Sequence, residues 1–164
     1  MYMDKTYIDG VNKTYSKQCS RRQMLPKFII DQPLPKDCVV LDYGAGRDGY
    51  GTQILRDYFY DVVAYDIGKN FVEGLHDVNA LDKQYYDVIM MSNIMNIQPS
   101  VSDAIAVLKE VKECLRPFGL VYCNLPKSPR KCDLNEGILK ILMKGIFEEV
   151  YVHKNNIFEG EKVC

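Results

Sequence analysis

The fold is decided by one stretch of the chain, Val39-Val40-Leu41-Asp42-Tyr43-Gly44-Ala45-Gly46-Arg47-Asp48-Gly49-Tyr50-Gly51. Three apolar residues typical of a buried strand lead into a carboxylate, then into a glycine-rich turn, and then into a helical pattern of apolar residues. Glycine lets the backbone adopt positive φ and lets a ligand approach the main chain closely. The helix that follows presents free N–H groups and the positive end of its dipole. This pattern predicts a loop that binds a nucleotide-type cofactor.

Composition limits the class of protein. The chain has 164 residues, of which 47% are hydrophobic, and this size predicts one compact domain. A net charge of -1 argues against a globally basic nucleic-acid binder, although it leaves local patches open. No apolar run approaches the roughly 20 residues that cross a bilayer, and the N-terminus has no signal-type apolar core. We therefore expect a cytoplasmic protein with no membrane association.

The cysteines agree with that compartment. Six cysteines are scattered along the chain without a C-x-x-C pair, and only two histidines accompany them. This pattern disfavours both a zinc site and a disulfide framework, so no metal site is predicted. Reduced thiols fit the cytosol.

The N-terminal arm, residues 1–36, is the least periodic region and carries seven Lys or Arg against three Asp. One helix is expected around residues 20–30, interrupted near Pro26 and stopped by the prolines that follow. The basic side chains form either a solvated face or a lip that meets a phosphorylated or polyanionic substrate. The predicted organisation is therefore a basic arm followed by a cofactor-binding domain over residues 37–164.

Beyond the arm the pattern alternates strand and helix, which is typical of parallel α/β construction. Strands are expected at 38–42, 62–65, 87–91 and 120–123, with a short further strand within 71–81. Helices are expected at 50–60, 101–115 and 134–144, and a hairpin at 147–152 and 157–163. The predicted fold is a doubly wound, mostly parallel Rossmann-like sheet with an antiparallel C-terminal hairpin.

The spacing Gly44-x-Gly46-x-x-Gly49 matches the dinucleotide fingerprint, so an NAD enzyme is the first hypothesis to weigh. Asp66, at the end of the second strand, is placed to accept hydrogen bonds from ribose hydroxyls, which NAD and S-adenosylmethionine both present. Asp42 separates the two cofactors, because a carboxylate repels a pyrophosphate and attracts an ammonium or sulfonium, by about 1 kcal/mol per exposed contact. The sign of the charge favours S-adenosylmethionine.

Five blocks of the sequence resemble, in order and approximate spacing, the motifs of class I S-adenosylmethionine-dependent methyltransferases. They are Leu41–Gly46, Val63–Asp66, Asp77-Val78, Asp87–Asn93 and Leu115–Gly119. The resemblance covers residues 38–164 and implies a seven-stranded sheet whose last strand is antiparallel. It also implies a cofactor bound across the carboxyl ends of the first strands.

Two short segments further resemble small methyltransferase-like proteins of bacteriophages. They are Asn12-Lys13-Thr14 and Ser92-Asn93-Ile94-Met95-Asn96.

The family resemblance implies a set of contacts to the methionine end of the cofactor. Gly44 and Gly46 would line the methionine moiety, and Asp42 would lie near its ammonium, directly or through water. The backbone carbonyl of Asn93 would face the same ammonium. The alternative is local, because glycine and asparagine are also favoured in tight turns.

A second set of implied contacts holds the adenosine end. Asp66 would bind the ribose, Asp77 the adenine amino group, and the backbone N–H of Val78 an adenine ring nitrogen. Here too a structural alternative stays open, since Asp66 could simply end a strand and Asp77 could close an Asx turn.

No catalytic residue is predicted, because a sulfonium is a good leaving group and alignment of the acceptor can suffice. The amino-methylating nucleic-acid enzymes of this family carry two prolines and an aromatic after the fourth strand, where this chain has Ser92-Asn93-Ile94-Met95. That departure argues against methylation of exocyclic amines in DNA. Asn96 either orients an acceptor or caps a turn.

A basic loop after the fifth strand, with Lys127, Arg130 and Lys131, is expected over the same sheet edge as the cofactor. We expect this loop and the N-terminal arm to bracket an anionic methyl acceptor, and a nucleic acid stays open as a partner. Two alternatives remain: a protein that sequesters, degrades or senses S-adenosylmethionine, and a catalytically silent interaction domain of the same fold.

Overall fold

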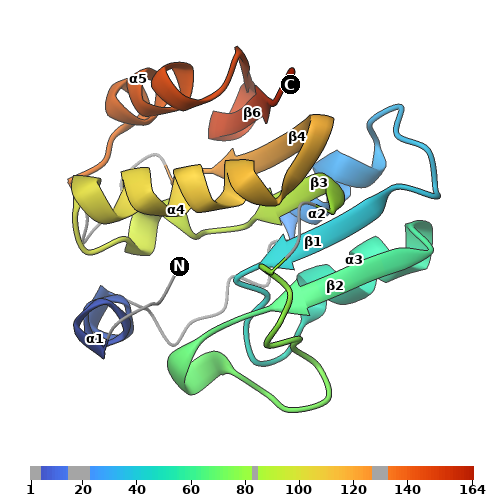
Figure 1. Ribbon diagram of the computed structural model, residues 1–164, viewed down its shortest axis with the longest axis horizontal. Coiled ribbons are helices and arrows are strands. Elements are labelled where there is room, and N and C mark those ends of the chain that lie inside the picture. Colours follow the sequence, from blue (N-terminus) through green and yellow to red (C-terminus); the bar gives the residue numbers. More distant parts are fainter. Residues whose placement is uncertain (1–4, 15–22, 83–84, 127–132) are drawn as a thin grey trace.

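Six strands form a single sheet at the centre of the molecule, in the order β2-β1-β3-β4-β6-β5 (Figure 1). The computed structural model describes residues 5–14, 23–82, 85–126 and 133–164. Its strands are β1 (Val39–Tyr43), β2 (Asp61–Tyr65), β3 (Tyr86–Met91), β4 (Leu115–Asn124), β5 (Glu149–His153) and β6 (Ile157–Glu161). Strands β1 to β4 pair in parallel, and β6 runs antiparallel to both β4 and β5. The mostly parallel Rossmann-like sheet predicted from the sequence is confirmed.

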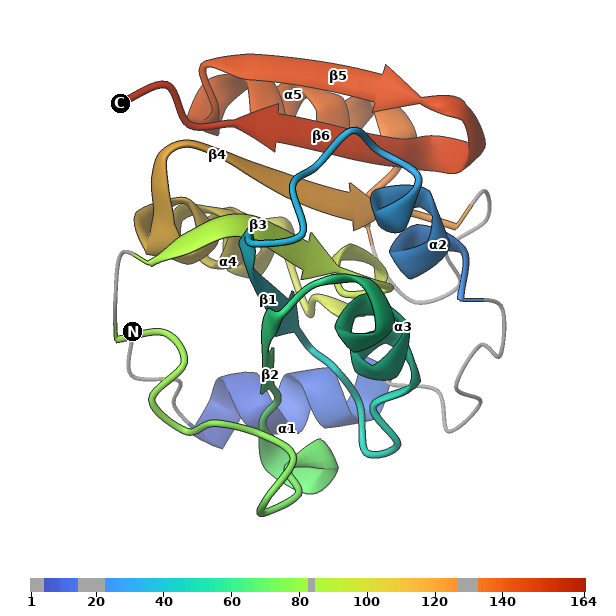
Figure 2. The same cartoon turned by 90° about the vertical axis from the view of Figure 1, so that its right-hand side faces the viewer.

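Helices cover both faces of this sheet. They are α1 (Lys5–Thr14), α2 (Met24–Ile30), α3 (Tyr50–Tyr58), α4 (Val101–Cys114) and α5 (Glu136–Ile146), with 3-10 turns η1 (Gly68–Asn70), η2 (Met95–Ile97) and η3 (Lys154–Asn156). Figure 2 shows α2 and α3 on one side of the strands and α4 and α5 on the other. Alternate residues of β1 face the two layers, since Val40 packs with α2 and α3 whereas Leu41 and Tyr43 pack with α4.

The resemblance implied seven strands, and this number is not confirmed, because the described residues form six. The strand expected within residues 71–81 is reduced to one isolated bridge between Ala64 and His76. Immediately after it, the backbone N–H of Asn79 donates to Asp77 Oδ1 (2.8 Å), which closes an Asx turn. The segment therefore leaves β2 before a ladder can form.

The hairpin is also arranged differently from the expected antiparallel edge. The antiparallel strand β6 lies between β4 and β5, so the edge strand β5 runs in the same direction as the parallel strands. The sequence predicts two strands and a turn here, but the local pattern contains nothing that decides which strand inserts next to β4.

The N-terminal region holds two helices where the sequence predicted one. Helix α1 was not predicted; it contacts η1, and the hydroxyl of Tyr7 donates to Gln98 Oε1 (2.8 Å). Pro26 does not interrupt α2, because it lies in the first turn, where a missing N–H removes no helical hydrogen bond. Leu25 and Ile29 of α2 are buried in the core, so this helix belongs to the packed domain.

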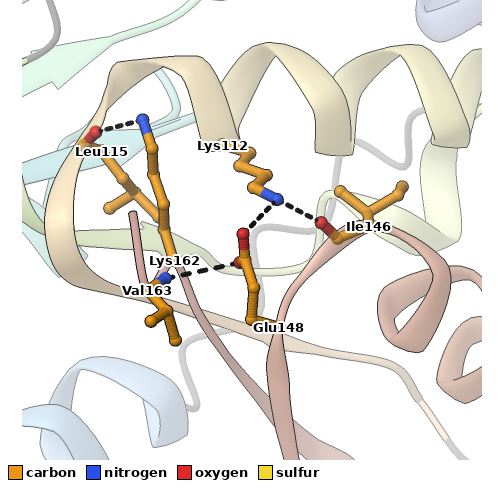
Figure 3. Close-up of polar contacts among 6 residues, drawn as sticks. All are labelled: Lys112, Leu115, Ile146, Glu148, Lys162 and Val163. Atoms are coloured by element: carbon orange, nitrogen blue, oxygen red, sulfur yellow. Dashed lines mark hydrogen bonds and ion pairs between the residues drawn. The ribbon is translucent and has the colours of Figure 1, made fainter.

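Two lysines near the amino ends of the strands bind backbone carbonyls, and one of them also pairs with a carboxylate (Figure 3). Lys112, in the last turn of α4, donates to the carbonyl of Ile146 (2.6 Å) and to Glu148 Oε1 (2.9 Å). Lys162 donates to the carbonyl of Leu115 (2.8 Å). These bonds satisfy carbonyls at the ends of α5 and α4 and attach both helices to the C-terminal hairpin.

Candidate functional site

A cavity of about 610 Å³ opens at the carboxyl ends of the parallel strands. Its wall is formed by the glycine turn after β1, the end of β2, the loop after β3 and the end of β4, with parts of α1 and α2. Open α/β sheets bind ligands at this edge, and small-ligand pockets have volumes of about 300–1,000 Å³. The cavity is therefore the candidate binding site.

Two glycines of the turn have different structural roles. Both adopt positive φ, 79° at Gly44 and 75° at Gly46. A Cβ at Gly44 would clash with the side chain of Ile94, so packing as well as backbone conformation favours glycine there. A Cβ at Gly46 would meet nothing within 4 Å. Gly46 therefore borders open space, as expected where a ligand approaches the backbone.

The N–H groups of this turn are all engaged by the end of β2. Gly44 and Ala45 donate to the carbonyl of Tyr65 (2.8 and 3.0 Å), and Gly46 donates to Asp66 Oδ2 (2.6 Å). In a dinucleotide site such N–H groups bind the pyrophosphate. None of these three N–H groups is therefore free to bind a phosphate.

Two carboxylates border the same turn. Asp42 is only 1% exposed, and the hydroxyl of Thr52 donates to its Oδ2 (2.7 Å). Burial raises the pKa of Asp42 to about 7, against the lowering effect of that hydrogen bond. Burial also raises the pKa of Asp66, while its hydrogen bonds from Ile67 and Gly46 act in the opposite direction.

No described lysine or arginine lies within ion-pair distance of Asp42 or Asp66. The described wall contains a third aspartate, Asp48, and no Lys, Arg or His. The described part of the cavity is therefore an acidic environment that suits a cationic or hydroxyl-bearing ligand.

His76 fixes the position of the glycine turn, a role that the sequence analysis missed. Its Nδ1 accepts from the backbone N–H of Val72 (2.8 Å), so its Nε2 carries the proton and donates to the carbonyl of Gly46 (2.9 Å). The ring is 7% exposed. No local signal indicated this contact, because it joins residues that are far apart in the sequence.

Asn93 lines the cavity and is held by Asn124, a second residue that the sequence analysis did not assign to the site. The backbone N–H of Asn93 donates to Asn124 Oδ1 (2.8 Å), and Asn124 Nδ2 donates to Asn93 Oδ1 (2.9 Å). Asn93 has a φ of 56°, which asparagine tolerates. The pair connects the loop after β3 to the end of β4. A polar residue at a strand end was the only signal for Asn124.

Asp77 and Val78 do not line this cavity. They lie on the segment 71–78, which forms a separate and more open depression, and Val78 is 67% exposed. The structure thus brings Asp42, Gly44, Gly46, Asp66 and Asn93 together around one cavity. The adenine contacts of Asp77 and Val78 stay predictions.

Asn96, in η2, also lines the cavity, and its Oδ1 is buried without a hydrogen-bond partner among the described residues. An unpaired buried acceptor costs about 1–3 kcal/mol of stability. Asn96 is the central residue of η2, whose N-cap is Ile94. Its role, to orient an acceptor or to end a turn, stays a prediction.

The basic residues expected around the acceptor lie mostly outside the described residues. These are Lys17, Arg21, Arg22, Lys127, Arg130 and Lys131. Their predicted role in binding an anion stays a prediction.

The family assignment agrees with this geometry. Residues 12–150 match the model of a methyltransferase domain family, and the chain belongs to that family. A search of curated protein sequences finds no match. Among the described residues, no helix is long and apolar enough to span a membrane.

Solved structures with this fold include an S-adenosylmethionine-dependent methyltransferase from Methanosarcina mazei, with 15% identity over 83% of this chain and 97% of that one, and a TM-score of 0.60. The 1,6-didemethyltoxoflavin-N1-methyltransferase of Burkholderia thailandensis, solved with bound 1,6-didemethyltoxoflavin and S-adenosylhomocysteine, has 17% identity over 97% of this chain and 84% of that one, with a TM-score of 0.66.

A third neighbour is a 16S rRNA methyltransferase from T. thermophilus, in complex with AdoMet and guanosine, with 16% identity and a TM-score of 0.61. It matches 88% of this chain, which spans 40% of that protein. The family and these neighbours confirm the class I methyltransferase resemblance found in the sequence. The resemblance to bacteriophage proteins finds no support among these matches.

Proposed function

We propose that this protein transfers the methyl group of S-adenosylmethionine to an acceptor bound in the same cavity. The observation that carries the proposal is the state of the glycine turn. Its three N–H groups are engaged by the carbonyl of Tyr65 and the carboxylate of Asp66. Asp42, which is buried, and Asp66, which is half-buried, have no lysine or arginine partner among the described residues. This arrangement disfavours a pyrophosphate and suits an ammonium, a sulfonium and a ribose.

The residues present fit that cofactor. Gly46 leaves open space beside the backbone, where the methionine moiety would lie, and the backbone carbonyl of Asn93 would face its ammonium. Asp42 would attract the ammonium, and each oxygen of Asp66 has a remaining lone pair for a ribose hydroxyl. When bound, S-adenosylmethionine supplies a methyl group on a good leaving group.

The work of the chain in this reaction is to bind and orient. Thr52 holds the Asp42 carboxylate, His76 holds the turn, and Asn124 holds Asn93, so the cofactor contacts are rigidly placed. Aligning two reactants in this way can supply a large part of the rate enhancement without a general base.

The proposal is tested by two measurements on the full chain. Titration calorimetry with S-adenosylhomocysteine should show binding, and transfer of tritium from labelled S-adenosylmethionine should yield a labelled product. Breakdown of the cofactor without an acceptor would favour a protein that degrades it, and binding with neither transfer nor breakdown would favour one that sequesters or senses it. Absence of any heat or thermal shift would favour a silent interaction domain.

The charge of the acceptor is a separate question. The hypothesis of an anionic acceptor depends on Lys127, Arg130 and Lys131, which lie outside the described residues. No contact of the described wall supports it.

A further inference from the structure

We infer that Asn96 selects the methyl acceptor, by accepting a hydrogen bond from an N–H or O–H group of a small uncharged or cationic molecule. This inference rests on the proposed methyl transfer and names the substrate class for that same cavity. This substrate class differs from the anionic acceptor that the basic loop led us to expect.

The first observation is the unused oxygen of Asn96. Its Oδ1 is buried without a partner, although Asn93 and Asn124, on the same wall, satisfy one another. Buried polar side chains in native proteins are nearly always hydrogen-bonded, and each exception calls for a specific explanation, of which a role in binding or catalysis is one. Asn96 lines the cavity, so a turn of its amide about χ2 would bring this oxygen to a ligand bound there.

The second observation is the charge around it. The described wall contains Asp42, Asp48 and Asp66 and no cationic side chain. A phosphate or carboxylate on the acceptor would share one partly desolvated cavity with these carboxylates, and repulsion there is stronger than in water. A neutral or amine-bearing acceptor avoids this repulsion.

The chemistry of methyl transfer limits what Asn96 can do with the proton that the acceptor loses. The acceptor's lone pair forms the new bond to the methyl carbon, the carbon–sulfur bond breaks, and its electron pair stays on sulfur to give S-adenosylhomocysteine. The proton that the acceptor loses passes to solvent, because an amide oxygen is too weak a base to take it. Asn96 thus acts as a positioning residue, which holds the N–H or O–H and so aims the lone pair.

Two substitutions separate a positioning role from a structural one. Asn96→Leu removes the oxygen at nearly constant size, and Asn96→Asp keeps an oxygen acceptor at the same position. Tritiated S-adenosylmethionine is incubated with each variant and with a small-molecule cell extract that ion exchange has divided into anionic, neutral and cationic fractions. Binding of S-adenosylhomocysteine and the Tm are measured in parallel.

We expect label in the neutral or cationic fraction. Asn96→Leu should lower kcat/KM for that product about 10- to 100-fold, the usual effect of leaving a substrate N–H or O–H unpaired. Asn96→Asp should stay within a few-fold of the wild type. Affinity for S-adenosylhomocysteine should be unchanged in both variants, and the Tm of Asn96→Leu should be equal to or above that of the wild type.

Three results would overturn the inference while the proposed function stands: label in the anionic fraction, wild-type kinetics in Asn96→Leu, or a loss in Asn96→Asp equal to that in Asn96→Leu. Binding of the cofactor with no label in any fraction would overturn both the inference and methyl transfer. Failure to bind S-adenosylhomocysteine would overturn the proposed function at its first step.

Discussion

Carboxylates at the amino ends of the strands, the amino edge of the sheet, have cationic partners, whereas those at the carboxyl ends, the carboxyl edge, do not. At the amino edge, Asp87 pairs with Arg116 (3.0 Å) and Glu148 pairs with Lys112 (2.9 Å). The partner lysine lowers the pKa of Glu148. At the carboxyl edge, burial raises the pKa of Asp42 and Asp66, and no described lysine or arginine pairs with either.

The difference separates carboxylates that are paired within the fold from those that we propose serve a ligand. A buried carboxylate without a cation destabilises the free protein, whereas an exposed ion pair contributes little in either direction. Charges that are unfavourable for folding persist at sites where a ligand compensates them. The contrast therefore predicts which substitutions change cofactor binding and which change only stability.

The largest effect is expected from Asp66→Ala. Loss of the charged hydrogen bonds to the ribose should weaken S-adenosylhomocysteine binding by about 3–4 kcal/mol. Titration calorimetry measures this loss, and Asp87→Ala is the matched control, because Asp87 lies at the other edge of the sheet. Equal affinity in the two variants would remove Asp66 from the site.

The second-largest effect is expected from Gly44→Ala, which should lower the stability of the fold. The left-handed backbone and the contact with Ile94 should together cost about 2–3 kcal/mol of unfolding free energy. Gly145→Ala is the control, because Gly145 lies within α5 and a Cβ there meets nothing within 4 Å. Urea denaturation should show destabilisation in the first variant and a slight gain in the second. If Gly145→Ala were the more destabilising of the two, the close packing of Gly44 in its turn would be contradicted.

Asp42→Asn should show a pH-dependent effect. The pKa of Asp42 is about 7, so its charge, and with it the attraction for the ammonium, is present only above that pH. Wild-type affinity for S-adenosylhomocysteine should increase about tenfold from pH 6 to pH 8, and Asp42→Asn should lack this increase. Parallel pH profiles in the two proteins would show that another group controls binding.

The raised pKa of Asp42 also makes the stability of the protein depend on pH. Stability falls as the pH rises, whereas cofactor affinity increases. A carboxyl whose folded-state pKa is raised stabilises the fold below its ordinary pKa, and this contribution is lost as pH rises through about 7. The Tm of Asp42→Asn should therefore exceed that of the wild type at pH 8 and approach it at pH 5. Thermal unfolding at the two pH values checks this.

The smallest effect is expected from Lys112→Met at the amino edge. Lys112 is partly exposed, so loss of its pair with Glu148 and of its bond to Ile146 should lower the Tm by less than Gly44→Ala does. Cofactor affinity should not change. A weaker cofactor complex in this variant would mean that the two edges are coupled.

The parts of the fold that sequence predicts are those encoded within a few neighbouring residues. The stretch 39–51 contains the strand, the turn and the helix start in order, and the apolar run at Val88–Met91 identifies a buried strand. The start of α4 is equally local, because Ser100 accepts from the backbone N–H of Asp103 (3.0 Å) and so caps the helix.

The parts that sequence does not predict depend on contacts between distant residues. The segment around His76 was expected to be a strand, because nothing local shows that its ring bonds Gly46. Likewise, the unpaired oxygen of Asn96 becomes visible only once the neighbours of η2 are known. The location of the site could thus be predicted, while the residues that hold it in place could not.

The bridge made by His76 also bears on how such sequences diverge. One imidazole ring accepts from the N–H of Val72 and donates to the carbonyl of Gly46 at the same time, because its two nitrogens can take opposite roles. Lineages that lose this histidine should therefore carry compensating changes in the turn at residues 44–46, so the two positions should covary among homologues.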